Sequence, residues 1–271
     1  MNICEGMTVN IREELLSIMR RAGEIVLGAH NMESDGAVRE KSGDVANMVT
    51  VYDVSVQNYL ITEIKKLIPD AEFIAEEKEN AEDSLGAEYC FVIDPIDGTA
   101  NFVHNCRHSA ISLAMISHGV TLFAAVYNPY LDEMFYAALG DGAYLNGQKI
   151  QASERDMPHS IVTVGTSPYY KNELGEATFS LCRKLFYACS DVRRLGSAAL
   201  DLCYVAAGRT DIFFEYRLSP WDFAAGALIV TEAGGVITDM QGGTPSLAKP
   251  ISILASNKNV HAAVLDIILR N

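Results

Sequence analysis

The sequence predicts a mixed α+β or α/β protein whose helices and sheets form layers in the order αβαβα, and two observations support this prediction. Helix-spaced apolar segments alternate with short apolar runs typical of buried strands along most of the 271-residue chain. Several predicted strands also end in Asp or Glu, which suggests that acidic side chains gather where strands leave the core.

The first 153 residues are predicted to contain two helices, a loop and a series of strands. Apolar residues at helical spacing predict helices at residues 11–29 and 50–68, and the polar segment 33–47 between them is predicted to be a flexible loop. Short apolar runs predict strands at residues 72–75, 89–93, 109–117, 122–127 and 134–138. The pair Asn146-Gly147 is typical of a tight hairpin turn.

The remainder of the chain alternates strands with helices. Apolar runs predict strands at residues 161–165, 192–195, 211–216, 236–238 and 252–255. Helical spacing predicts helices at residues 174–187, 197–207, 221–233 and 259–269. A soft boundary near Ser153 divides an α+β half, residues 1–153, from an α/β half, residues 154–271. Because no long linker separates the halves, we expect residues 1–271 to form a single domain.

The chain is acidic, with 21 Lys and Arg against 35 Asp and Glu and a net charge of -14. Nucleic acids and anionic membranes attract basic surfaces, so this charge argues against both as partners. It does not exclude a phosphate-bearing substrate, because bound cations can reverse the local field. The sequence shows no bilayer-spanning apolar run, no signal-peptide pattern and no Cys-x-x-Cys pair, so we expect a cytoplasmic protein with reduced cysteines.

The sharpest local feature is the hexapeptide Asp-Pro-Ile-Asp-Gly-Thr at residues 94–99, which follows a predicted strand. The proline fixes φ and Gly98 permits a left-handed backbone, so Asp94 and Asp97 can face one point. Carboxylate oxygens in this position suit Mg²⁺, and the free N–H groups of Gly98 and Thr99 can hold an anion. A surface turn uses the same residue types, so the hexapeptide alone is compatible with either reading.

Three further carboxylates lie at the ends of predicted elements. Glu76 follows a strand in the motif Ala-Glu-Glu, and Asp222 begins a helix in the motif Trp-Asp-Phe-Ala-Ala-Gly. Asp53 lies three residues after Thr50 at the start of the second helix. Each of them alone is explained as an acidic turn or a helix-capping residue. Their occurrence in one chain with the hexapeptide favours a common acidic site.

In this order and spacing, the motifs Glu-Glu, Asp-Pro-Ile-Asp-Gly-Thr and Trp-Asp-x-Ala-Ala-Gly resemble those of the inositol monophosphatase family, which belongs to the lithium-sensitive, Mg²⁺-dependent sugar phosphatases. The resemblance covers nearly the whole chain, from the first predicted helix to the last. It implies the layered αβαβα sugar-phosphatase fold, a homodimer and a metal-binding hydrolase that cleaves a phosphomonoester with two or three Mg²⁺ ions. It also implies inhibition by millimolar Li⁺.

The resemblance implies a set of metal ligands. Glu76, Asp94 and the backbone carbonyl of Ile96 would hold a first Mg²⁺. Asp94, Asp97 and Asp222 would hold a second ion. A third, looser ion would depend on Glu76 and water molecules.

The resemblance also implies catalytic and substrate-binding residues. Asp53 would orient the hydroxyl of Thr99, which helps to activate the attacking water, so Glu76, Thr99 and Asp53 are the expected catalytic residues. The backbone of Gly98 and Thr99 would bind the phosphate. The positions that match those touching the alcohol are Gly196, Ser197, Ala198 and Glu215.

The sequence departs from the family pattern at three positions. Ala75 stands where Gly usually precedes Glu-Glu, and Phe91 stands where Trp usually precedes the hexapeptide. Asn47 stands where an acidic residue is often found near the third metal ion. The change at Asn47 affects the expected affinity for the third ion and leaves the reaction type unchanged.

The grouping of five carboxylates has a physical consequence of its own. Like charges about 4 Å apart repel by roughly 4 kcal/mol at an effective dielectric constant near 20, so five such groups cannot all stay ionised without cations. Divalent ions offset this repulsion, neutralise a phosphate, lower the pKa of a bound water and stabilise the leaving alkoxide. Attack by that water needs no covalent intermediate, and the sequence shows no competing Ser/His/Asp arrangement.

Alternatives remain for the substrate and for the function. Fructose-1,6-bisphosphate, histidinol phosphate, 3′-phosphoadenosine 5′-phosphate and NADP(H) are alternative substrates on the same fold, although the residues at the alcohol positions favour inositol or sugar phosphates. Glu215 could instead pair with Arg217 at a strand end. A regulatory protein that contacts RNA polymerase or RNA is a different class of function, which some bacterial relatives have. The complete carboxylate set and the charge of -14 favour the enzyme.

Overall fold

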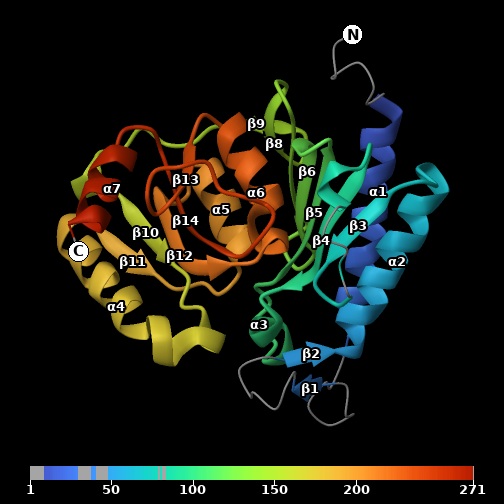
Figure 1. Ribbon diagram of the computed structural model, residues 1–271, viewed down its shortest axis with the longest axis horizontal. Coiled ribbons are helices and arrows are strands. Elements are labelled where there is room, and N and C mark those ends of the chain that lie inside the picture. The colour runs from blue at the N-terminus through green and yellow to red at the C-terminus, as the bar shows by residue number, and fades with distance from the viewer. Residues whose placement is uncertain (1–8, 30–37, 41–47, 79, 81–83, 271) are drawn as a thin grey trace.

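The computed structural model describes residues 9–29, 38–40, 48–78, 80 and 84–270. Two β-sheets lie side by side, with one pair of helices between them and another pair on each outer face (Figure 1). The predicted order αβαβα is therefore confirmed. Among the described residues, no helix combines the length and apolar character needed to cross a lipid bilayer.

The first outer layer consists of α1 (Val9–Leu27) and α2 (Val51–Leu67), which pack on a seven-stranded sheet. The strands lie in chain order: β3 (Glu72–Ala75), β4 (Cys90–Asp97), β5 (Ala110–Ser117), β6 (Val120–Asn128), β7 (Glu133–Ala138), β8 (Gly142–Leu145) and β9 (Gln148–Ile150). Only β3 and β4 pair in parallel, so both run toward the same edge of the sheet. The predicted hairpin at Asn146-Gly147 joins β8 to β9.

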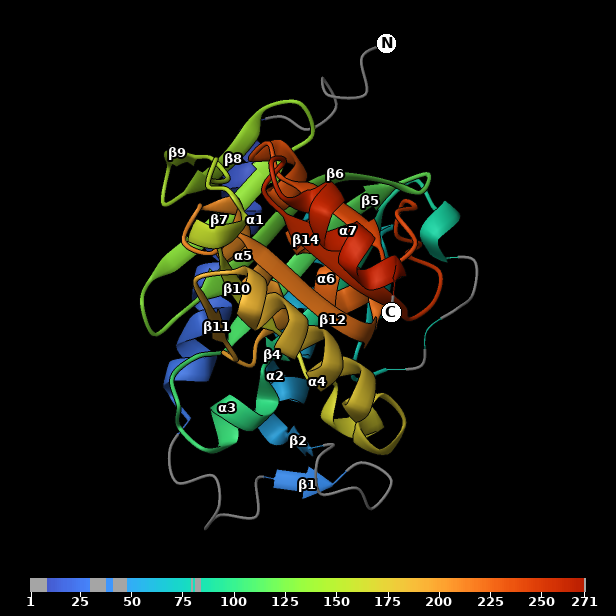
Figure 2. The ribbon, with the colours of Figure 1, turned by 90° about the vertical axis from the view of Figure 1, so that its left-hand side faces the viewer.

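The second sheet has the strand order β11-β10-β12-β14-β13. Its strands are β10 (Ile161–Val164), β11 (Asp191–Arg193), β12 (Ile212–Leu218), β13 (Val236–Asp239) and β14 (Ile251–Ser256). The outer face of this sheet is covered by α4 (Lys171–Ala188) and α7 (His261–Leu269), which lie in front of it in Figure 2. β10 and β12 are parallel, so they end at the same edge.

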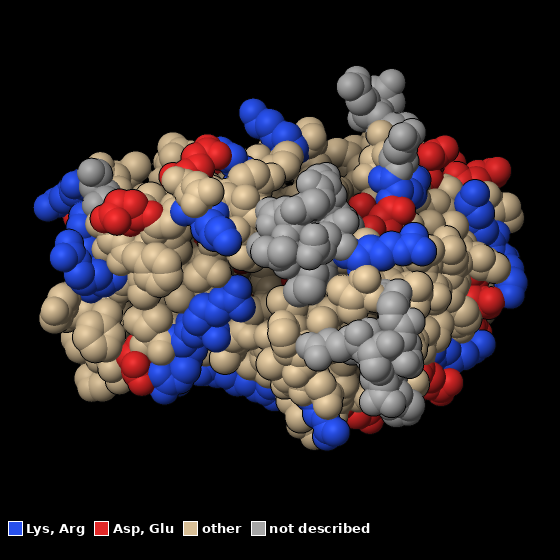
Figure 3. Space-filling model, turned by 90° about the horizontal axis from the view of Figure 1, so that it is seen from below, with Lys and Arg blue, Asp and Glu red and all other residues tan. Residues whose placement is uncertain are grey.

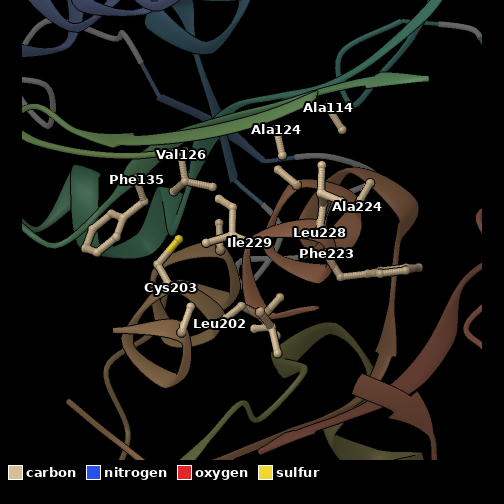
Figure 4. Packing of buried hydrophobic residues seen from close by; sticks show 14 of the residues in the cluster. Ala114, Ala124, Val126, Phe135, Leu202, Cys203, Phe223, Ala224, Leu228 and Ile229 are labelled. Atoms are coloured by element: carbon tan, nitrogen blue, oxygen red, sulfur yellow. The ribbon is translucent and has the colours of Figure 1, made fainter. Parts of the chain in front are cut away.

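The middle layer consists of α5 (Ala198–Ala206) and α6 (Pro220–Glu232). Side chains of the first sheet face both helices across a buried apolar layer, in which Phe135 and Val126 lie opposite Ile229 (Figure 4). Small residues let the two helices approach closely: a Cβ on Gly226 would lie 2.5 Å from a methyl group of Leu202. These helices come from the second half of the sequence but pack on the sheet of the first half, so one core joins the two halves.

Two sequence predictions were wrong in part. The segment 33–47 was predicted to be a loop, but β1 (Val38–Glu40) pairs with β2 (Met48–Thr50) in a two-stranded ribbon. The other residues of that segment lie outside the described part of the chain. The strand predicted at 192–195 is shorter and shifted, because β11 pairs with β10 only as far as Arg193 opposite Thr163. Beyond Arg193 the chain turns toward the middle layer.

Candidate active site

A cavity of about 290 Å³ lies where elements of the two halves meet. It is bordered by the ends of β3, β4 and β12 and by the first turns of α5, α6 and the short helix α3 (Thr99–Val103). Seen from below, Lys and Arg side chains border a recess near the centre of the surface (Figure 3). Most of the residues proposed from the sequence line this cavity: Glu76, Asp94, Ile96, Asp97, Gly98, Thr99, Gly196, Ser197, Ala198, Glu215 and Asp222.

The hexapeptide ends the buried strand β4 and turns two carboxylates into the cavity. The pairing of β4 with β5 shifts its register between Asp94 and Asp97, so the chain bulges there. Asp94 Oδ1 accepts a hydrogen bond from the N–H of Ile96 at 3.0 Å, which holds the turn. Asp97 Oδ2 accepts one from the N–H of Ala199 at 2.8 Å and another from the Ser197 hydroxyl. Asp97 therefore connects the first sheet to the start of α5.

Asp222 reaches the same point from α6. It is the third residue of that helix, and its Oδ2 accepts a hydrogen bond from the N–H of Ser219 at 2.7 Å in a capping box. One carboxylate oxygen each from Asp94, Asp97 and Asp222 lies within 4.8 Å of the others. Three hard oxygen donors at this separation fit a divalent cation such as Mg²⁺.

The electrostatics of this group also fit a cation. Burial raises the pKa of Asp94 well above its usual value, and the negative charges of Glu76 and Asp97 raise it further. Burial followed by repulsion from Asp97 has the same effect on the pKa of Asp222. Burial raises the pKa of Asp97 to about 6, although its hydrogen bonds from Ser197 and Ala199 act in the opposite direction. A bound cation would favour the ionised form of all three carboxylates.

Glu76 lies at the rim of this group, directly after β3. Its side chain is half-buried and lines the cavity, and its backbone N–H donates to the carbonyl of Ile93 at 3.3 Å. The two residues of the adjacent strands that depart from the family pattern both belong to the core. Ala75 is fully buried, and Phe91 stacks on Phe73 with ring centroids 5.8 Å apart. Asn47 lies outside the described residues.

Asp53 and Thr99 do not make the hydrogen bond that the resemblance implied. Asp53 Oδ2 accepts hydrogen bonds from the N–H of Thr50 at 2.7 Å and from its hydroxyl at 2.5 Å, in the capping box of α2. Among the described residues, Asp53 Oδ1 has no hydrogen-bond partner. The Thr99 hydroxyl instead donates to the carbonyl of Ile96 at 3.2 Å. Burial raises the pKa of Asp53 to about 7. The proposed role of Asp53 in orienting the Thr99 hydroxyl therefore stays a prediction.

The turn after Asp97 brings backbone N–H groups to the cavity. Gly98 has φ of 85°, and a Cβ at this position would lie 2.8 Å from the carbonyl oxygen of Gly196. The left-handed backbone and this close approach both require glycine. α3 begins at the next residue, so the N–H groups of its first turn lie beside the carboxylates. Such N–H groups are suited to hold a phosphate oxygen.

Glu215 also borders the cavity. It comes from β12, and its Oε1 accepts hydrogen bonds from the N–H of Ser167 at 2.9 Å and from the Ser167 hydroxyl at 3.2 Å. Its carboxylate fills the space left by Gly165, since a Cβ there would lie 1.9 Å from Glu215 Oε2. Burial raises the pKa of Glu215 to about 7. The alternative that Glu215 pairs with Arg217 is wrong, because Arg217 pairs with Glu173.

Sequence reasoning missed several residues that line the cavity, among them Ser167, Tyr169 and Asp201. Asp201 is 1% exposed, and its Oδ1 lacks a hydrogen-bond partner among the described residues. Burial, followed by the charge of Glu215, raises the pKa of Asp201 well above its usual value. A single Asp inside the otherwise apolar helix α5 was the available signal for this residue. Ser167 and Tyr169 come from a turn whose position depends on β12 and α4, which no local pattern indicates.

The family model of the inositol monophosphatase family matches residues 9–270. A Nus factor SuhB from Escherichia coli (strain K12) is 40% identical over 247 residues, which are 91% of each chain. Among solved structures, extragenic suppressor protein suhB from Bartonella henselae has a TM-score of 0.86 at 32% identity, covering 96% of this chain and 98% of the other. An IMPase from Thermotoga maritima has a TM-score of 0.82 at 32% identity, covering 97% and 98%. A match of the family model over this length shows that the chain is a member of the inositol monophosphatase family.

Proposed function

We propose that this protein is a Mg²⁺-dependent phosphomonoesterase that hydrolyses inositol monophosphate or a related small polyol or sugar phosphate. The observation that carries the proposal is the approach of Asp94, Asp97 and Asp222 to within 4.8 Å, beside the N–H groups that follow Gly98. Membership of the family supports the reaction type. The cavity is large enough for a small phosphorylated alcohol and polar enough to bind one.

The first group of cavity residues would bind the metal ions. Glu76, Asp94 and the Ile96 carbonyl would hold one Mg²⁺, while Asp94, Asp97 and Asp222 would hold a second. Bound Mg²⁺ supplies positive charge that offsets the phosphate and makes a coordinated water more acidic. A third ion would depend on Glu76.

The other residues would position the water and the substrate. The Thr99 hydroxyl would accept a hydrogen bond from the attacking water, and Asp53, whose Oδ1 has no hydrogen-bond partner among the described residues, would orient that hydroxyl by accepting a hydrogen bond from it. The N–H groups of Gly98 and Thr99 would donate to phosphate oxygens. Glu215 would accept hydrogen bonds from hydroxyls of the alcohol, with Gly196, Ser197 and Ala198 forming the adjacent wall.

A phosphate-release assay over a panel of phosphomonoesters tests this proposal. The panel includes inositol 1-phosphate, fructose-1,6-bisphosphate, histidinol phosphate, 3′-phosphoadenosine 5′-phosphate, NADP⁺ and p-nitrophenyl phosphate, each with Mg²⁺ and with EDTA. We expect Mg²⁺-dependent release, fastest from inositol 1-phosphate. Fastest release from another member of the panel would reassign the substrate, and no release from any of them would contradict the enzyme.

The resemblance to the family and the sequence itself suggest three further properties, which we propose with it. Li⁺ at millimolar concentration should inhibit by occupying the site of Asp94, Asp97 and Asp222. The protein should be a homodimer in the cytoplasm. Inhibition is measured against NaCl at equal ionic strength, and the dimer is measured by light scattering. A monomeric mass would contradict the dimer without affecting the chemistry.

A second candidate function is a regulatory protein that contacts RNA polymerase or RNA. It is favoured by relatives such as the Escherichia coli protein, which carries the name Nus factor. The sequence-based argument against nucleic acid is not supported by these relatives, and net charge is a poor guide here. The acidic excess lies in residues 1–153, with 10 Lys and Arg against 23 Asp and Glu, whereas residues 154–271 contain 11 and 12. Recovery of RNA polymerase with the tagged protein from a lysate would support this function.

A further inference from the structure

The turn that precedes α4 is held in a strained conformation at the edge of the cavity. Ser167 has φ of 40°, a left-handed value for a residue other than glycine, and it is 5% exposed. Its N–H donates to Glu215, and its single hydroxyl proton is shared between two acceptors, Glu215 and the carbonyl of Tyr216. Because strain of this kind costs free energy, it persists only where surrounding contacts impose it, and it is concentrated at functional sites.

A second set of contacts holds the turn from its other side. Arg217 also has a left-handed backbone, with φ of 55°, and its guanidinium lies 4.6 Å from the ring centroid of Tyr170. The same guanidinium makes two hydrogen bonds to Glu173 in the first turn of α4, at 2.8 and 2.5 Å. The turn is thus fixed between β12 and α4, and Tyr169 is its central residue.

Tyr169 lines the cavity, and its hydroxyl has no hydrogen-bond partner among the described residues. Its side chain is 47% exposed. Burial raises the pKa of Tyr169, followed by the negative charges of Glu76, Asp222, Asp94 and Asp97. Those charges belong to the proposed metal ligands, which line the same cavity as Tyr169. A phenol in these surroundings stays protonated and remains a hydrogen-bond donor.

We propose that Tyr169 is a substrate-binding residue whose hydroxyl donates a hydrogen bond to the phosphate group of the phosphomonoester. The proposal rests on the proposed function, because the phosphate is placed beside the metal ligands. Tyr169 lines the same cavity as Glu76, Asp94, Asp97 and Asp222. An anionic phosphate is a stronger hydrogen-bond acceptor than an alcohol hydroxyl, which favours the phosphate as the acceptor.

The test compares Tyr169→Phe with the matched variant Tyr187→Phe, in which an 82% exposed tyrosine of α4 outside the cavity loses its hydroxyl. Three quantities are measured with Mg²⁺: kcat/KM for inositol 1-phosphate, kcat/KM for p-nitrophenyl phosphate, and Kd for inorganic phosphate by titration calorimetry. Thermal unfolding checks that each variant is folded. Removal of one donor to a charged acceptor predicts that both kcat/KM values fall about tenfold or more and that Kd for phosphate rises by a similar factor for Tyr169→Phe, with no change for Tyr187→Phe.

The possible results separate this proposal from the proposed function. Equal values for the wild type and Tyr169→Phe, in an active enzyme, would overturn the role of Tyr169 alone. A loss confined to inositol 1-phosphate would move the contact to the alcohol and overturn the assignment to phosphate. A wild-type protein that neither binds phosphate nor releases it would overturn the phosphatase itself, and the proposal for Tyr169 with it.

Discussion

Asp94 is a buried carboxylate whose strongest electrostatic neighbours are all acidic: Glu76, Asp97, Asp222 and Asp53. Its ionised form therefore depends on bound cations. Asp94→Asn keeps the shape of the side chain and an oxygen that can accept the hydrogen bond from Ile96, but it removes the charge. We expect the variant to lose nearly all phosphatase activity, since several kcal/mol of transition-state stabilisation depend on the metal ions. Activity with inositol 1-phosphate and thermal unfolding in EDTA are measured together.

The two measurements on Asp94→Asn distinguish a catalytic loss from a structural one. The unfolding temperature in EDTA should equal or exceed that of the wild type, because without cations the wild type must hold Asp94 either protonated or as a buried charge beside other carboxylates, and the amide avoids both costs. An inactive variant that unfolds well below the wild type would show only that Asp94 supports the fold. Turnover at the wild-type rate would contradict the assignment of the site.

Glu215→Gln should change which substrates are hydrolysed well. Loss of a charged hydrogen-bond acceptor costs about 1.5–3 kcal/mol. We therefore expect kcat/KM for inositol 1-phosphate to fall by roughly one to two orders of magnitude. p-Nitrophenyl phosphate presents no hydroxyl groups, so its hydrolysis should barely change. Equal losses on both substrates would indicate that Glu215 supports the metal site or the fold.

The same substitution should change how stability depends on pH. Burial raises the pKa of Glu215 from 4.5 to about 7 in the folded protein. Between these values the folded state holds more protons than the unfolded state, so this group lowers stability as pH rises from about 4.5 to about 7. Glu215→Gln removes this contribution. The unfolding temperature of the variant minus that of the wild type, in EDTA, should increase from pH 5 to pH 8, and a difference independent of pH would contradict the raised pKa.

The sequence predicted those site residues whose position depends on a single strand end or helix start. Asp94, Asp97 and Asp222 occur at a strand end and a helix start, and the structure brings them together as the motifs suggested. Tyr169 and Asp201 could not be predicted in this way. Tyr169 reaches the cavity only because β12 and α4 fix its turn, and Asp201 faces the cavity only once α5 is packed between the sheets.

At the scale of elements, the junction of β4 and α3 depends on Gly98. In Gly98→Ala the methyl group would meet the carbonyl oxygen of Gly196 at 2.8 Å, in a backbone with φ of 85°. Gly119→Ala is a matched control, because Gly119 has φ of 81° and nothing within 4 Å of its Cβ position. The left-handed backbone alone costs roughly 1–2 kcal/mol in either variant.

The difference in unfolding temperature between the two variants measures the effect of the close contact between residue 98 and the carbonyl of Gly196. We expect Gly98→Ala to unfold at a lower temperature than Gly119→Ala and to lose most of its activity, since the N–H groups of α3 would shift. Gly119→Ala should retain wild-type kcat and KM. Equal effects of both substitutions on unfolding and activity would mean that the contact with Gly196 has no role.

Element boundaries were predictable where they depend on local chemistry and were missed where they depend on pairing. Helix α2 begins after Thr50 because Thr50 and Asp53 form a capping box, as the sequence suggested. β1 was missed because three residues form a strand only against β2. The pairing of β11 with β10 ends at Arg193 opposite Thr163, and no pattern in the sequence indicates this end.

At the scale of the whole molecule, the site exists only when the two halves are packed together. Asp97 from the first sheet accepts hydrogen bonds from the start of α5, and Asp222 reaches it from α6. The order of layers was predictable because alternating periodicities fix the elements and their buried faces. The net charge of -14 was a poor basis for excluding nucleic acid as a partner, because the second half of the chain is nearly neutral.

Because the three carboxylates that would hold Mg²⁺ come from both halves of the chain, a bound Mg²⁺ should stabilise the entire fold. A ligand at about 100 times its Kd that binds only the folded state adds about 2.7 kcal/mol to the free energy of unfolding. For a chain of this size, about 1 kcal/mol raises the unfolding temperature by roughly 2–4 °C, so saturating Mg²⁺ should raise it by about 5–10 °C. Asp94→Asn should show little of this increase. NaCl at matched ionic strength is the control, because it screens repulsion among the carboxylates without bridging them. An equal increase with NaCl would mean that the carboxylates need only screening, and the case for bound divalent ions would fail.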